Sequence, residues 1–174
     1  PESEGFYEDQ VRQLAESLQG ARGAAVFFHS PLLHAPDHGR IEDCLGRLDV
    51  GTRRNSESPA TLERTLQRAG VRQGVCFRNP GTLARELLSV ECPLVTFSGH
   101  VHHGTAIEWD RTTFGLRSVP LRAPQHPART MMLLTAPAIG QVVAGEEGLP
   151  GYLLCKFEDG KLVSLARRTL PIGH

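Results

Sequence analysis

Two short and almost wholly apolar runs, each leading to a histidine, most constrain what this chain can fold into. Residues 24–28 read Ala-Ala-Val-Phe-Phe and stop at His29, while residues 93–97 read Pro-Leu-Val-Thr-Phe and lead shortly afterwards to His100. Runs of this length without a polar face are typical of strands buried on both faces of a sheet. We therefore expect an α/β fold in which two buried strands carry histidines to the carboxyl edge of the sheet, where such folds bind ligands.

The second run continues into a Gly-His-Val-His-His-Gly motif at residues 99–104. Because side chains alternate along an extended chain, His100 and His102 are expected to project to one face, and the flanking glycines permit a sharp turn. Neutral imidazoles held on one side of a strand end suit a metal ion. The alternatives are a core or loop histidine at position 29 and a turn with exposed imidazoles at positions 100 and 102.

Other segments give clear signals of secondary structure. An amphipathic helix is expected over residues 8–18, and a second helix, which begins with Pro at its first turn, is expected from about residue 80 to residue 89. Beyond the histidines the chain becomes rich in strand signals. The clearest is a hairpin of residues 152–157 and 161–166 around Asp159-Gly160, a pair favoured where both central residues need positive φ.

Composition excludes several classes of protein. The chain has 174 residues, 40% of them apolar, which is enough for one domain with a core, and its 19 basic residues balance 19 acidic ones. Without a long basic block, a broad nucleic-acid-binding surface is not expected. The four cysteines form no C-x-x-C pair, and no apolar stretch could span a membrane. We expect a cytoplasmic protein with free thiols.

In their order and surroundings, the two histidine motifs resemble the C-terminal half of a calcineurin-like metallophosphoesterase. The family has a strand that ends in a lone His, here followed by Pro31-Leu32, and later a strand that ends in Gly-His-x-His, here residues 99–102. Its usual helix pattern Gln-x-x-x-Leu-x-x-x-Leu is present from Gln10 to Leu18. The family's Asp-x-His, Gly-Asp and Gly-Asn-His motifs are absent. The resemblance therefore implies a fragment or processed portion of a longer protein.

The fold that the resemblance implies is α/β, the C-terminal half of a four-layer α-β-β-α sandwich with mixed sheets. Residues 1–174 would form a single partial domain, in which residues 33–73 are a family-variable insertion near the site. The missing N-terminal part, on a complementary segment or chain, would supply the remaining ligands and the general-acid histidine.

The function that the resemblance implies is hydrolysis of a phosphomonoester or phosphodiester by water attack at a dinuclear metal centre. It assigns His29 and His100 to one divalent ion and His102 to the other, with Mn, Fe or Zn as the candidate metals. The isolated chain is expected to bind metal weakly and to show little or no turnover. The alternatives are a non-catalytic scaffold and a simple metal-binding module derived from that fold.

Three further histidines are candidates for substrate contact. His34 and His38, with Asp37 beside them, follow the first histidine strand, and His103 follows the second motif directly. Solvated loop positions are the alternative for His34 and His38, and a supporting or surface position is the alternative for His103. The segment 33–73 is expected to select the phosphoester substrate.

Overall fold

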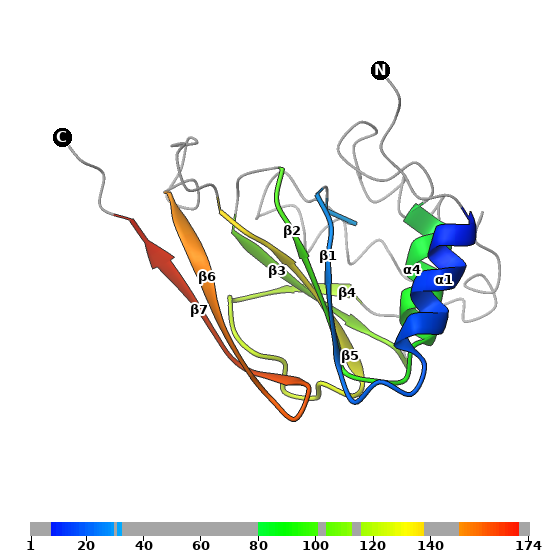
Figure 1. The fold of residues 1–174 in the computed structure, drawn as a ribbon. Coiled ribbons are helices and arrows are strands. Elements are labelled where there is room, and N and C mark those ends of the chain that lie inside the picture. The colour runs from blue at the N-terminus through cyan, green and yellow to red at the C-terminus, as the bar shows by residue number, and fades with distance from the viewer. Residues whose placement is uncertain are drawn as a thin grey trace, which may run out of the picture.

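The computed structural model describes residues 8–29, 31–32, 80–100, 104–112, 116–137 and 150–170. These residues form two helices, a five-stranded mixed sheet and a separate two-stranded antiparallel sheet (Figure 1). The prediction of a mixed α/β fold is confirmed. The elements are α1 (Glu8–Leu18), β1 (Ala24–Phe27), α4 (Pro80–Ser89), β2 (Leu94–Ser98), β3 (Thr105–Asp110), β4 (Leu116–Val119), β5 (Thr130–Thr135), β6 (Gly151–Glu158) and β7 (Lys161–Thr169).

The strand order of the large sheet, β1-β2-β5-β3-β4, brings together strands that are far apart in the sequence. Strands β1, β2 and β5 are parallel neighbours, whereas β3 runs antiparallel to both β5 and β4. The carboxyl ends of β1, β2 and β5 therefore lie at one edge of the sheet, which we call the carboxyl edge. This is the edge to which both histidine motifs lead.

One face of the large sheet packs against the two helices. Alternate residues of the strands point to this face and contact apolar side chains of α1 and α4, as the period of two along a strand requires. Trp109 and Met131 have no exposed surface and lie at the centre of this cluster. Its buried members are Val11, Val26, Leu32, Leu83, Leu87, Leu88, Leu94, Ile107, Trp109, Met131 and Leu133.

The other face of the large sheet packs against the β6–β7 hairpin, so that the described residues form three layers. Leu162 and Leu165 of the hairpin are buried among Val95, Ala106, Met132 and Leu134 of the sheet. At the opposite end from the carboxyl edge, the hairpin turn crosses the chain before β1. An added Cβ at Gly23 would lie only 1.8 Å from the carbonyl oxygen of Gly160, so this crossing requires glycine.

The hairpin leaves strand β1 uncovered. The prediction that both histidine strands are buried is confirmed for β2, whose residues are mostly buried, but it is wrong for β1. The ring of Phe27 points to the hairpin side and is 74% exposed. The physical reason is that, in the described part of the chain, the second sheet consists of β6 and β7, which cover β2, β5 and β3.

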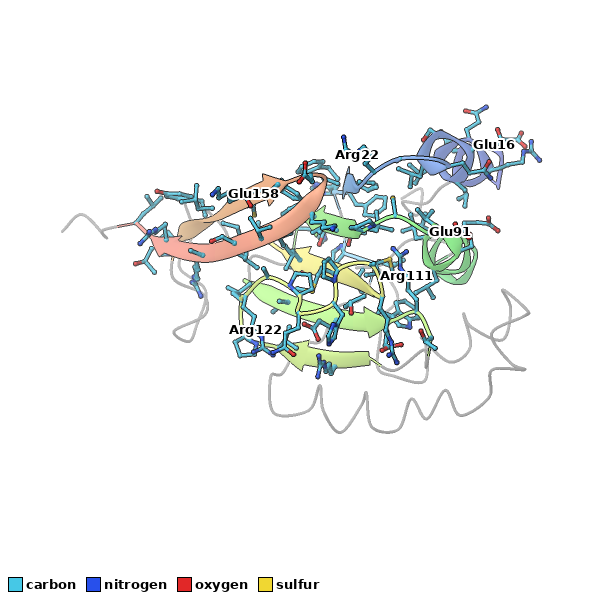
Figure 2. The ribbon with its side chains drawn as sticks, turned by 90° about the horizontal axis from the view of Figure 1, so that it is seen from below. Glu16, Arg22, Glu91, Arg111, Arg122 and Glu158 are labelled. Atoms are coloured by element: carbon cyan, nitrogen blue, oxygen red, sulfur yellow. The ribbon has the colours of Figure 1, made fainter. Side chains whose placement is uncertain are left out.

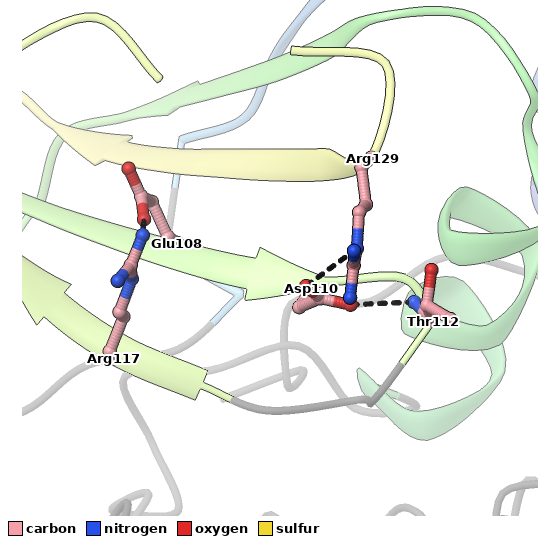
Figure 3. Close-up of polar contacts among 5 residues, drawn as sticks. All are labelled: Glu108, Asp110, Thr112, Arg117 and Arg129. Atoms are coloured by element: carbon pink, nitrogen blue, oxygen red, sulfur yellow. Dashed lines mark hydrogen bonds and ion pairs between the residues drawn. The ribbon is translucent and has the colours of Figure 1, made fainter. Parts of the chain in front are cut away.

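Two ion pairs fix the β3–β4 side of the sheet (Figure 3). The carboxylate of Glu108, which is only 3% exposed, accepts a hydrogen bond of 2.6 Å from Arg117 Nε on β4. At the end of β3, Asp110 pairs with Arg129 at 3.0 Å and accepts a hydrogen bond of 2.8 Å from the backbone N–H of Thr112. Asp110 lies at the end of β3 opposite the carboxyl edge, because it pairs with Thr130 at the start of β5.

None of the helices in the described part of the chain is long and apolar enough to cross a membrane. The predicted insertion at residues 33–73 lies outside the described residues.

Candidate metal site at the carboxyl edge

The described part of the candidate site consists of His29 and His100, which follow neighbouring parallel strands. β1 ends at Phe27 and β2 ends at Ser98, and the register of the pair places Phe27 beside Phe97. Each histidine therefore lies two residues beyond the end of its strand. The expectation that the two strands carry these histidines to one edge is confirmed.

The two imidazoles approach each other closely. Nε2 of His29 lies 3.1 Å from Nδ1 of His100, and the ring planes meet at 73° with centroids 5.0 Å apart. Both residues are exposed to solvent. At this distance one ring nitrogen donates a hydrogen bond to the other, and the tautomers of the two rings decide which one is the donor.

The same separation fits two ligands of one ion. With metal–nitrogen bonds of about 2.0–2.1 Å, nitrogens 3.1 Å apart subtend an angle of about 95–100° at the metal, between octahedral and tetrahedral values. Within the ranges that the structure describes, no group of three or more potential metal ligands is present.

The backbone of His100 is in the left-handed region, with φ of 63°. This conformation is uncommon for a residue other than glycine, and such residues concentrate at functional sites. It also corrects one step of the sequence argument. Alternation along an extended chain does not apply at position 100, because the strand has ended and the left-handed turn now sets the direction of the side chain.

Backbone hydrogen bonds continue past the strand ends and fix the two histidines relative to each other. The N–H of Gly99 donates to the carbonyl oxygen of His29 at 3.0 Å, and the N–H of Phe28 donates to the carbonyl oxygen of Phe97 at 2.8 Å. The carbonyl oxygen of Ser98 in turn accepts from the N–H of Ala136 at 2.8 Å. The site is thus built on three strands and not on an isolated loop.

The last residues of β2 and β5, Ser98 and Thr135, form a buried pair of hydroxyl groups next to the site. Ser98 Oγ is 3.2 Å from Thr135 Oγ1 and 3.3 Å from the carbonyl oxygen of Leu134, so it connects the ends of β2 and β5. The sequence analysis did not identify this pair. The available signal was a hydroxyl residue at the end of each apolar run, which the sequence alone could not join across 37 positions.

The remaining candidates from the sequence lie outside the described residues. They are the metal-ligand candidate His102 and the substrate-contact candidates His34, His38 and His103. Their roles stay predictions.

A second feature lies at the end of the large sheet opposite the carboxyl edge, where β1 and β2 begin. A cavity of about 520 Å³ opens between the C-terminal ends of α1 and α4, and its lining includes Glu86, Glu91 and Cys92. Nearby, Arg111 donates a hydrogen bond to the carbonyl oxygen of Val90. Burial lowers the pKa of the Arg111 guanidinium, and Cys92 acts in the opposite direction. This cavity is separate from the histidine site, since it lies where β1 and β2 begin.

Comparisons with protein-family models, with curated proteins and with solved structures found no match to this chain.

Proposed function

We propose that this chain is the C-terminal part of a calcineurin-like metallophosphoesterase, which hydrolyses a phosphomonoester or a phosphodiester at a dinuclear metal centre. The observation that supports this proposal most is the 3.1 Å approach of His29 Nε2 to His100 Nδ1. Those nitrogens belong to the two strand-terminal motifs on which the family resemblance rests. Their separation suits two ligands of one cation.

The arrangement of layers gives further support. In this proposal the helices, the mixed sheet and the antiparallel hairpin would be three of the four layers of the family's α-β-β-α sandwich. The fourth layer would lie on the outer face of the hairpin. Tyr152 and Leu154 on β6 are 45% and 54% exposed, as expected of a face that a further layer covers.

In this proposal, His29 and His100 hold one divalent ion and His102 belongs to the second, with Mn, Fe or Zn as the metal. Such ions would offset the negative charge of the phosphate and lower the pKa of the attacking water. The described residues hold the two imidazoles in place. The hydrogen bond from the Gly99 N–H to the carbonyl oxygen of His29 and the contact between Ser98 and Thr135 keep both rings at the carboxyl edge. The remaining ligands and the general acid would come from a complementary N-terminal segment or chain.

The first test is metal binding by the 174-residue chain. Titration with Mn²⁺ or Zn²⁺, followed by calorimetry, should show weak binding that His29→Ala and His100→Ala each reduce by about 10-fold or more, since loss of one of few ligands is costly. His126→Ala is the matched control, because His126 is an exposed histidine in the loop before β5. Unchanged binding in both site variants would refute the ligand assignment.

The second test separates phosphoester chemistry from the two alternatives. With Mn²⁺ and an aryl phosphate, the chain alone should show little or no turnover, and turnover should appear when a complementary N-terminal segment is supplied. Robust, His100-dependent turnover by the chain alone would contradict the assignment of the other ligands to a missing part. Metal binding that never leads to turnover would favour a metal-binding module, and neither activity would favour a scaffold.

A further inference from the structure

Arg167 on β7 extends from the hairpin toward the large sheet, at the end of the sheet that carries the histidines. Its Cδ lies 3.8 Å from the position of a Cβ added at Gly104, and its Nε is buried. The next residue, Arg168, is exposed, because successive side chains of a strand point to opposite faces. The hairpin therefore places one arginine of this pair against the large sheet and the other in solvent.

A series of contacts connects Arg167 to the histidine site. Gly104 directly precedes β3, which pairs with the end of β5 at Thr135. Thr135 and Ser98 contact each other through their hydroxyl groups at 3.2 Å, and Ser98 is the last residue of the strand that leads to His100. Because β5 separates β3 from β2, Gly104 lies two strand spacings, or about 10 Å, from the end of β2. Arg167 and the imidazoles therefore border the same edge.

Charged groups are distributed unevenly between the two ends of the strands. Among the described residues, the strand ends at the carboxyl edge carry no carboxylate, and their basic groups are the two imidazoles and the two arginines of β7. Carboxylates lie at the opposite end, where Glu91 precedes β2 and Glu158 ends β6 next to the hairpin turn (Figure 2, viewed from that end). A surface lined by one sign of charge attracts ligands of the other sign. The charge of the described strand ends at the carboxyl edge therefore favours an anion.

We infer that Arg167 binds a phosphate group of the substrate, an inference that rests on the proposed phosphoester chemistry. The planar guanidinium can pair with two oxygens of a phosphate. It has enough N–H groups to do so beside the contacts that Arg167 makes within the chain.

The order of the residues in the second motif favours this position for the phosphate. His102, the ligand candidate for the second ion, lies in the sequence between His100 and Gly104. A phosphate held by both ions would therefore lie on the Gly104 side of His100, which is the side of Arg167. There the guanidinium would orient the phosphate and offset its charge, and it would transfer no proton because it stays protonated.

The experiment titrates inorganic phosphate into the metal-free 174-residue chain and follows binding by NMR, including the Nε–H signal of Arg167. Arg167→Gln should weaken phosphate binding by about 10-fold or more, because it removes charge-assisted hydrogen bonds. Arg168→Gln is the matched control, since it removes the same charge from the exposed neighbour; at physiological salt it should change the affinity by less than about 2-fold. Arg167→Lys keeps the charge without the planar fork and should give an intermediate affinity.

Metal titrations separate this inference from the proposed metal centre. Arg167→Gln should bind Mn²⁺ as the unchanged chain does, because Arg167 is not a ligand candidate. If His29→Ala and His100→Ala leave metal binding unchanged while phosphate binding still depends on Arg167, the metal centre is wrong and the phosphate contact stands. If metal binding requires both histidines but phosphate affinity does not depend on Arg167, the phosphate contact is refuted and the metal centre stands.

Three further results would overturn the inference: equal losses of phosphate affinity in Arg167→Gln and Arg168→Gln, no saturable phosphate binding, or phosphate binding that leaves the Arg167 Nε–H signal unmoved. Circular dichroism should show that the variants are folded. If Arg167→Gln did not fold, Arg167→Lys and the Nε–H signal of the unchanged chain would still decide the question.

Discussion

Replacing His100 by glycine is expected to make the fold more stable than replacing it by alanine, although both changes remove the candidate ligand. The backbone at His100 has φ of 63°, in the left-handed region. An L-residue there costs roughly 1–2 kcal/mol, which glycine avoids because it has no Cβ. The ring contact with His29 is lost in both variants, so it cancels in the comparison.

The expected difference follows from two opposing effects. Glycine loses more conformational entropy than alanine on folding, by about 0.5–1 kcal/mol. Subtracting this from the left-handed cost leaves the glycine variant about 0.5–1 kcal/mol more stable. At His126 the sign should reverse, because His126 is not among the described non-glycine residues with positive φ. There the glycine variant should be about 0.5–1 kcal/mol less stable than the alanine variant.

The assay is urea unfolding of the four variants in the presence of a chelator, followed by circular dichroism. Chelation matters because a bound cation would stabilise the wild-type site and obscure the backbone term. If His100→Gly were less stable than His100→Ala by the same amount as the His126 pair, the backbone at the site would not be strained. The same variants should show no difference between glycine and alanine in their loss of metal binding.

Two other predictions concern stability away from the site. Arg117→Met should lower the free energy of unfolding by about 2–3 kcal/mol, because it leaves the 3% exposed carboxylate of Glu108 unpaired. Arg129→Met removes the partner of the more exposed Asp110 and should lower it by less than about 1 kcal/mol. Equal losses of stability in urea titrations of the two variants would contradict this prediction. Burial raises the pKa of the Cys155 thiol, so the folded chain retains this proton where the unfolded chain releases it, and the free energy of unfolding should fall as the pH rises above about 8.5. Cys155→Val should reduce that alkaline decline, and a decline of the same size in this variant would count against the thiol as its cause.

Features set by local sequence were predicted well. The helix expected at residues 8–18 has those bounds as α1, and the hairpin around Asp159-Gly160 is present with longer strands than expected. Both depend on signals within a few residues: an apolar stripe in the helix, and a turn pair that accepts positive φ in the hairpin. Asp159 and Gly160 indeed have φ of 48° and 76°.

Features set by long-range pairing could not be predicted from the sequence. The insertion of β5 between β2 and β3 determines which residues lie under the histidines, and it creates the Ser98–Thr135 contact. The exposure of β1 has the same origin, since an apolar run does not reveal how many strands the opposite sheet has. The approach of His29 to His100 could be predicted because it needs only two parallel strands ending at one edge.

Two departures from what favours stability lie at the ends of the same two neighbouring strands. His100 occupies a left-handed conformation directly after β2, and Phe27, the last residue of β1, exposes a large ring two positions before His29. In the large sheet, most other apolar positions alternate into two cores as the strand period requires. Departures from local rules are expected where a protein has a function, because selection for the function maintains an arrangement that stability alone would not. The strand ends that hold the histidines are therefore the part of this molecule where mutation should affect function before it affects folding.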